Sequence, residues 1–282
     1  MIVLPRIINN RSTAFKISLF AILLIIPMII LLIFFLESEN ERIDFAKKEI
    51  AGSQYLAYIY PLQTGVAKHR GLMAGYLSGN VSFKEKIATA ERQISEQLKI
   101  VQALPKQFDS QAPLTSIQEN WQSLKNQSQL SLHDSFQLHS ALIQEILALI
   151  VQVADQSNLI LDPDLDSYYL MDLTIIAIPE LIEALGKARG GASAMVASKQ
   201  VNPQNIVSLH LYHHDISRIL LRTQTSLKTA FENTQNRQLN SQLARFENTL
   251  QTNIGQFLSL IKNDIERSSS VSINASQVFD TG

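Results

Sequence analysis

The sequence of 282 residues contains no cysteine, a single tryptophan and no excess of either charge. Without cysteine the chain can form neither a disulfide framework nor a thiolate metal site, and this absence fits an oxidising or a reducing compartment. The 24 basic and 25 acidic side chains nearly cancel, so the electrostatic footprint of a nucleic-acid-binding protein is missing. No nucleophile elbow, phosphate-binding loop or kinase signature is present, and we expect neither enzymatic activity nor a cofactor.

A long apolar run is the first feature that the sequence does contain. Residues 17–36, ISLFAILLIIPMIILLIFFL, are 20 consecutive uncharged residues. As a helix they would span roughly 30 Å, the thickness of the hydrocarbon core of a bilayer, and a membrane helix tolerates Pro27. The run is too long for a signal peptide, and the acidic stretch LESENER follows where a small-residue cleavage site would stand. We therefore predict an uncleaved membrane anchor.

The charges that flank this run predict its orientation. Only basic residues precede it and mostly acidic residues follow it: Arg6, Arg11 and Lys16 before, and Glu37, Glu39, Glu41 and Asp44 after. Because positive flanks stay in the cytoplasm, we expect residues 1–16 to be cytoplasmic and residues 17–36 to cross the inner (plasma) membrane. Residues 37–282 would then lie outside, which in a bacterium is the periplasm.

The rest of the chain has the periodicity of helices. Apolar residues recur at steps of three and four over residues 139–161 and, more weakly, over 206–231 and 239–261, and no stretch alternates as a strand does. Turn residues predict breaks at 79–80, 104–105, 112–113, 162–163 and 202–203. The helices between these breaks would be about 20 to 40 residues long. Helices of that length predict an all-α fold in which the anchor is followed by elongated antiparallel bundles, arranged as two stacked four-helix-type modules.

Two stretches of the chain form a faint internal repeat. The first runs from Pro61 to Leu77 and the second from Pro179 to Val196, and each carries an Arg-Gly pair inside an apolar helical stripe. Seven of the ten glycines lie in these stretches or within two residues of their ends: Gly65, Gly71, Gly75, Gly79, Gly186, Gly190 and Gly191. Glycine inside a helix costs roughly 0.5–1 kcal/mol relative to alanine, so the clustering needs a reason. Small faces of this kind allow another backbone or a small ligand to approach closely.

The arginines of the repeat, Arg70 and Arg189, have two interpretations. Each can be a bundle arginine that pairs with a carboxylate or extends to the surface. Alternatively, both guanidinium groups clamp an anion between helices through charge-assisted hydrogen bonds. His69 and Lys187 could add positive potential, and Gly71 and Gly190 would give the ligand room. Both interpretations remain open from the residues alone.

Two further motifs suggest metal sites, which we do not predict. Asp162, Asp164 and Asp166 alternate as in a calcium loop, but the positions that require Gly and Glu hold Ser167 and Leu173. We therefore expect Asp162 to cap a helix that has Pro163 in its first turn. The segment HLYHHD places His210, His213 and His214 on one helix, where a metal site is the alternative to a solvated polar face.

The motifs together resemble the periplasmic input region of bacterial methyl-accepting chemotaxis proteins. The resemblance rests on HRGLMAGYLSG, SNLILDPDLDSYYLMDL (157–173), the helix at Pro179 and ARGGASA (188–194), and it covers about residues 45–280. The same input region precedes diguanylate cyclases and sensor histidine kinases, and it is similar to the nitrate- and nitrite-sensing helical domain. In that domain an Arg-Gly pair lies on one long helix and a second arginine on a later helix.

This resemblance implies a chemotaxis signal transducer whose periplasmic helical domain binds a small anion. Arg70 and Arg189 match the ligand-contacting arginines of the family, whereas His69 stands where the nitrate-sensing pattern usually has Glu. The resemblance implies nitrate or nitrite as the ligand, but this departure counts against nitrate itself and leaves small carboxylates or other ligands open. The resemblance also implies a homodimer, and a chain truncated before a second transmembrane helix and an output domain. A non-sensing membrane-tethered scaffold and a periplasmic metal sensor are the alternatives.

Overall fold

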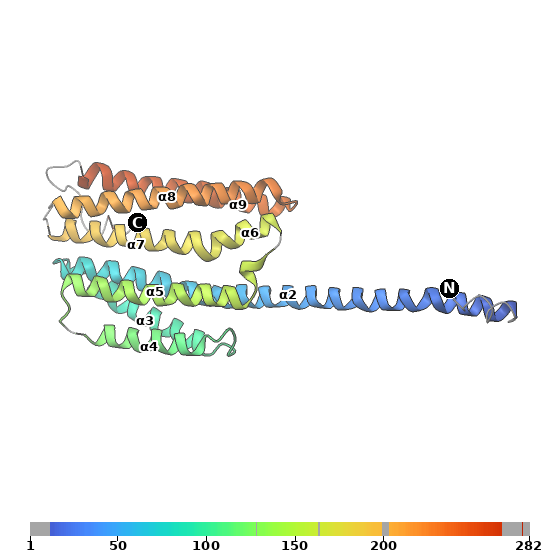
Figure 1. Cartoon of the computed structure of the whole chain (residues 1–282). Helices are drawn as coiled ribbons and strands as arrows, with labels where there is room; N and C mark the ends of the chain where they lie inside the picture. The colour runs from blue at the N-terminus through green and yellow to red at the C-terminus, as the bar shows by residue number, and fades with distance from the viewer. Residues whose placement is uncertain (1–11, 128, 163, 199–202, 267–277, 279–282) are drawn as a thin grey trace. The chain divides into compact units, whose positions relative to one another are not determined.

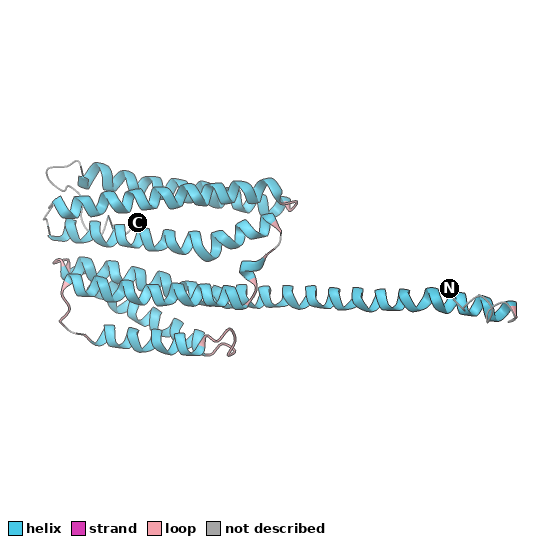
Figure 2. Cartoon of the chain, in the orientation of Figure 1, coloured by secondary structure: helices cyan, strands magenta, loops and turns pink. Residues whose placement is uncertain are grey.

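The computed structural model describes residues 12–127, 129–162, 164–198, 203–266 and 278. All the regular structure within these ranges is helical and none is strand, so the prediction of an all-α fold is confirmed at this level (Figures 1 and 2). The longer helices are α2 (Thr13–Leu77), α3 (Lys84–Gln102), α4 (Gln111–Asn126), α5 (Leu132–Gln156), α6 (Leu165–Asp172), α7 (Ile178–Ser198), α8 (Pro203–Asn233) and α9 (Arg237–Leu260). Short 3₁₀ segments, η1 (Val81–Phe83) and η2 (Leu159–Leu161), and π-helical segments, η3 (Leu173–Ala177) and η4 (Ile261–Glu266), lie between or after them.

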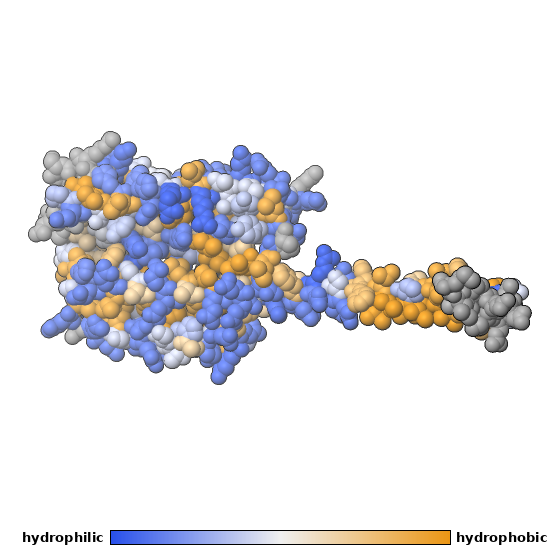
Figure 3. Space-filling model, viewed as in Figure 1, coloured by the Kyte–Doolittle hydropathy of each residue, from blue (hydrophilic) through white to orange (hydrophobic). Residues whose placement is uncertain are grey.

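The chain divides into two compact units, Met1–Lys48 and Glu49–Gly282, and α2 contributes to both. In the first unit, α2 is long and apolar enough to cross a membrane, and its large apolar side chains between Ile17 and Leu36 are exposed (Figure 3). α5 meets the same criterion of length and composition, but it supplies many of the buried core residues of the second unit. A core helix of a globular domain meets this criterion without crossing a membrane.

The second unit has a first core built from α2, α3, α4 and α5. Trp121 of α4 is fully buried there, and Met171 and Ile175 from the following segments join it. Burying one large apolar side chain contributes roughly 1.5–3 kcal/mol, so the burial of these side chains is the main contribution to the stability of the four-helix core. The remaining members are Tyr55, Leu56, Ile59, Leu62, Val66, Ala67, Ile94, Leu98, Val101, Leu114, Ile117, Leu124, Leu142, Ile143, Ile146, Leu149, Ile150, Val153 and Ala154.

A second core joins α7, α8 and α9 to the end of α2 and the start of α3. Leu72 of α2 and Phe83 of η1 are both fully buried within it. Phe83 fits because Gly75 lacks a side chain: a Cβ built on Gly75 would lie 2.3 Å from the Phe83 ring. α2 therefore contributes to each of these two cores, and a displacement of α2 against α7 would change the packing of both.

The helix ends agree with the predicted turns in part. α2 ends before Gly79, which has φ +109°, and α8 begins at Pro203. The predicted break at 112–113 is wrong, because Pro113 lies in the first turn of α4, where its missing N–H leaves no intrahelical bond unmade. α6 begins at Leu165 with Asp164 at its N-cap, so Asp162 is not the cap; its Oδ1 accepts from Asp164 N and Ser167 Oγ. Pro163 lies outside the described residues.

Candidate functional site

The two glycine-rich stretches of the repeat meet in the second unit. A Cβ built on Gly190 of α7 would lie 3.6 Å from the Cα of Gly71 on α2. One turn earlier, a Cβ on Gly186 would lie 2.9 Å from Arg70 Nη2 and 3.4 Å from the Ala67 side chain. The small residues thus let α2 and α7 approach closely, with the Arg70 guanidinium between them. A side chain at Gly186 would displace that guanidinium.

Arg70 is completely buried and forms an ion pair with a residue that sequence reasoning missed. Its Nη1 and Nη2 donate to the two carboxylate oxygens of Glu183 on α7, at 2.8 and 2.9 Å. Nη1 also donates to Ser140 Oγ of α5 at 2.9 Å, and the guanidinium lies 5.0 Å from the centre of the Phe136 ring. This fork-to-fork geometry is the strongest form of the arginine–carboxylate pair. It joins α2, α5 and α7 at one point.

Glu183 shares its carboxylate with a second cation. Lys187 Nζ, one turn later on α7, lies 3.3 Å from Glu183 Oε1, and its side chain is one-third exposed. A Glu four residues before a Lys is a common helix pair, which was the only signal in the sequence that involved Glu183. That spacing says nothing of Arg70, which is 113 residues away along the chain.

Arg189 lies within electrostatic reach of Arg70. Burial, followed by the positive charge of Arg70, lowers the pKa of Arg189 to about 10, so its guanidinium still carries its charge at neutral pH. Tyr212 of α8 belongs to the same surroundings, because its pKa, raised mainly by burial, also responds to Arg70 and Glu183. The structure therefore brings the two predicted arginines into one electrostatic environment, and it adds Glu183 and Tyr212.

His69 has different neighbours from Arg70. Its ring contacts Glu91 of α3, Trp121 of α4 and His139 of α5, whereas Arg70 contacts α5 and α7. That His69 adds to the positive potential around Arg70 stays a prediction. A Glu in its place would have been buried among the same three residues.

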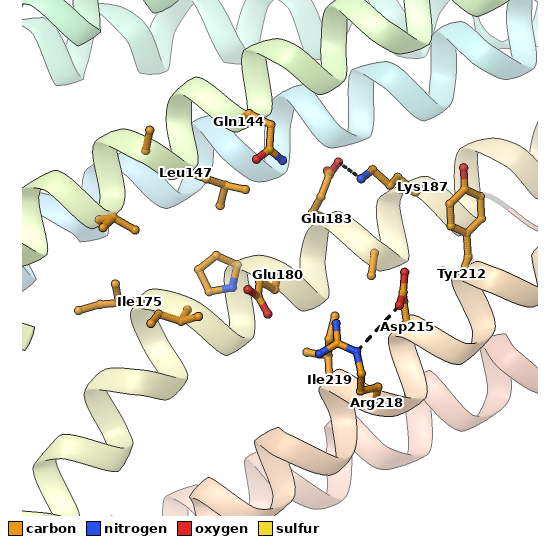
Figure 4. A pocket seen from close by; sticks show the side chains of 15 residues that line it. Gln144, Leu147, Ile175, Glu180, Glu183, Lys187, Tyr212, Asp215, Arg218 and Ile219 are labelled. Carbon is orange, nitrogen blue, oxygen red and sulfur yellow. Dashed lines mark ion pairs between the residues drawn. The ribbon is translucent and has the colours of Figure 1, made fainter. Parts of the chain in front are cut away.

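A pocket of about 530 Å³ lies between α5, the η3–α7 segment and α8 (Figure 4). This volume is in the range of small-molecule sites. Glu183 and Lys187 line the pocket, and Arg70 and Arg189 do not. α5 gives the pocket a mostly apolar wall with Gln144 as its polar member, and charged groups of α7 and α8 line the opposite side. The lining residues are Gln144, Leu147, Ala148, Val151, Ile175, Ile176, Pro179, Glu180, Glu183, Ala184, Lys187, Tyr212, Asp215, Arg218 and Ile219.

The wall of the pocket includes a π-helical segment that ends beside Pro179. In η3 the N–H of Ile178 bonds to the carbonyl of Leu173, five residues earlier. In that register the carbonyl of Thr174 should receive the N–H of residue 179, and proline has none. The phenol of Tyr60 on α2 donates to Thr174 O instead, at 2.8 Å. Burial raises the pKa of Tyr60 to about 12, which keeps this proton on the phenol.

We expect Tyr60→Phe to lower the free energy of unfolding by about 1 kcal/mol, because the Thr174 carbonyl loses its replacement donor. The measurement is urea unfolding of the full chain in detergent micelles. Tyr58→Phe is the matched control, since Tyr58 is 45% exposed on the same helix. Equal effects of the two substitutions would show that the bond to Thr174 contributes nothing.

The candidate metal motifs have no metal-binding geometry in the described parts of the chain. No group of three or more His, Asp or Glu is placed there to hold an ion. His214 is largely exposed, and its nearest carboxylate, Asp215, is 4.0 Å away. Asp172, which follows the aspartate-rich motif on α6, forms an ion pair: Arg222 of α8 donates to its Oδ1 at 2.6 Å. This second arginine–carboxylate pair joins α6 to α8.

No protein-family model matches the sequence, and comparisons with curated proteins and with solved structures give no match.

Proposed function

We propose that the chain is the ligand-sensing input portion of a membrane-anchored signal transducer of the chemoreceptor type. In this proposal residues 17–36 cross the inner membrane with the N-terminus in the cytoplasm, and residues 37–282 form a periplasmic domain of two stacked four-helix-type modules. The domain acts as a homodimer and binds a small anion such as nitrate, nitrite or a small carboxylate. The same module could equally serve a diguanylate cyclase or a histidine kinase.

The observation that carries this proposal is the Arg70–Glu183 pair at the contact between α2 and α7. A buried ion pair is an exchangeable contact, because any anion that replaces Glu183 on Arg70 restores the charge balance of the guanidinium. Glu183 would keep Lys187, which already lies 3.3 Å away, and it already lines the pocket. The lowered pKa of Arg189 reflects burial and repulsion by Arg70, and a bound anion would offset both effects.

Partner exchange would couple binding to movement. With Glu183 on Arg70, α7 is held against α2 through two hydrogen bonds. With an anion on Arg70, those bonds are lost and α7 is free to shift along the glycine contact. α2 also contains the apolar run, so the shift of α7 would change the preferred position of α2. A ligand drives this change only by its difference in affinity for the two packings.

The same ion pair favours a second candidate, a non-sensing membrane-tethered scaffold. In a scaffold a seam arginine pairs with a carboxylate and does not respond to ligands. The bidentate pairing of Arg70 with Glu183 is what a scaffold requires. The two functions differ in whether an anion can compete with Glu183.

We expect thermal unfolding of the full chain in detergent micelles to distinguish them. The probes are sodium nitrate, nitrite, acetate and succinate at matched ionic strength, with chloride as the reference. A probe at 100 times its dissociation constant should stabilise the chain by about 2.7 kcal/mol. Arg189→Gln should weaken this response, and Arg245→Gln, an exposed position on α9, should leave it unchanged. The scaffold function is supported if no probe stabilises the wild type, or if Arg189→Gln responds as the wild type does.

A further inference from the structure

Two histidines lie in contact inside the first core. The His69 side chain of α2 is 3% exposed and His139 of α5 is fully buried. His69 Nδ1 is 2.7 Å from His139 Nε2, and His139 Nδ1 is 2.6 Å from the carbonyl oxygen of Ser135. Both distances are those of hydrogen bonds.

The chain of contacts determines where the protons lie. A carbonyl oxygen only accepts, so His139 Nδ1 must carry a hydrogen and donate it to Ser135 O. His139 remains neutral, because burial, with the charges of His69 and Arg70, lowers its pKa to about 3. Its Nε2 therefore has a lone pair and accepts from His69 Nδ1–H. Every nitrogen of the pair is then assigned except His69 Nε2.

His69 Nε2 is buried, has no hydrogen-bond partner and faces a carboxylate. Glu91 Oε1 of α3 lies 3.6 Å from it, and the Glu91 side chain is one-third exposed. Without a proton on Nε2, its lone pair and the carboxylate repel each other. With a proton, the imidazolium and Glu91 attract each other. The interaction with His69 is the main cause of the lowered pKa of Glu91, and the partial burial of Glu91 acts in the opposite direction by raising that pKa.

We propose that His69 Nε2 and the Glu91 carboxylate form a proton-binding site inside the helical domain, so that pH is an input of this protein. The proton comes from water at the exposed edge of Glu91 and binds to Nε2. The groups that face the site are Glu91 on α3, Lys125 on α4, which acts on Glu91, and His139 on α5; on α2 itself Arg70 is the next residue, and Glu183 of α7 pairs with it.

Proton binding changes one contact between helices. It turns the repulsion between His69 and Glu91 into an ion pair that holds α3 against α2, and proton release reverses this. The site does not depend on an anion binding to Arg70, so it stands whether or not the proposed anion sensing is correct. Its position beside Arg70 places both inputs on the same turn of α2.

The single tryptophan is a natural reporter of this site. The Trp121 ring centre lies 5.0 Å from that of His69, with the ring planes at 80°, and Trp121 is fully buried. A protonated imidazole quenches indole emission more strongly than a neutral one. We therefore expect Trp121 emission of the full chain in detergent micelles to rise as the pH increases and the imidazolium releases its proton.

Two variants test the assignment. Glu91→Gln should move the midpoint of the emission change to lower pH by about 1 unit or more, because the carboxylate that favours the imidazolium is removed. His69→Gln should abolish the change, and His133→Gln, exposed at the start of α5, should leave it as in the wild type. Circular dichroism at each pH checks that the helices persist.

Three results would overturn the proposal. One is wild-type emission that is independent of pH while the helices persist. Another is a Glu91→Gln midpoint equal to that of the wild type. The third is a transition that survives in a folded His69→Gln variant. Because Glu91 is one-third exposed, Glu91→Gln is compatible with folding and decides the question even if His69→Gln fails to fold.

Discussion

Glu183→Leu is expected to lower the free energy of unfolding by about 3–5 kcal/mol, the largest effect of any single substitution considered for this chain. The substitution leaves the Arg70 guanidinium, which is 0% exposed, without its carboxylate. A buried charge without a partner keeps the full cost of removal from water, whereas in the native pair that cost is offset by attraction and by two hydrogen bonds.

Arg70→Met is expected to cost less than Glu183→Leu. The Glu183 carboxylate then still has Lys187, 3.3 Å away and one-third exposed, as a partner. The double variant Arg70→Met/Glu183→Leu should recover most of the loss, because an apolar pair of similar volume has no charge to bury. The asymmetry between the two single variants is specific to this arrangement of one carboxylate and two cations.

Urea unfolding of the full chain in detergent micelles, followed by Trp121 emission, measures all three variants. Lys99→Met is the control, because Lys99 and its partner Glu96 are 70% and 67% exposed and their pairing should matter little. If Glu183→Leu is no more costly than this control, the Arg70–Glu183 pair does not stabilise the fold. If the double variant is as unstable as Glu183→Leu, the loss comes from packing rather than from an unpaired charge.

His139 is expected to make the chain less stable in acid, well before the carboxylates are protonated. Burial, His69 and Arg70 lower the pKa of His139 from 6.5 to about 3. Below 6.5 the unfolded chain binds a proton at His139 and the native chain does not, so stability falls as the pH falls, down to about 3. The expected slope from this one group is about 1.4 kcal/mol per pH unit.

The measurement is urea unfolding at several pH values between about 6.5 and 5.5, above the ordinary range of carboxylates. His139→Gln preserves an acceptor for His69 and a donor for Ser135, and it should flatten the slope by the amount due to one proton. His133→Gln, at an exposed position, should keep the wild-type slope. Equal slopes in the wild type and His139→Gln would show that His139 does not stay neutral in the folded chain. Glu91, whose pKa is also lowered, adds a loss of the same sign only at lower pH.

The sequence by itself determined the helical class of the fold and the apolar segment. Apolar residues at steps of three and four, with no alternating stretch, predict helices because the period is a property of each local segment. The run at residues 17–36 is likewise a local feature, and its side chains are exposed in α2 as a lipid-facing segment would require. The two glycine-rich stretches were also visible in the sequence. The clustering of glycine indicated that another segment or a ligand approaches each stretch closely. It did not indicate that the two stretches contact each other.

Only the tertiary structure decided the partners of the buried polar side chains. Arg70 and Glu183 are 113 residues apart, His69 and His139 are 70 apart, and Tyr60 and Thr174 are 114 apart. Each pair depends on which helices are in contact and on their relative position along the helix axes, and helical periodicity specifies neither. Desolvation and hydrogen-bond geometry act only once those contacts exist. The sequence could therefore identify Arg70 as a charge inside an apolar face, and the packing of α7 against α2 determined that Glu183 compensates it.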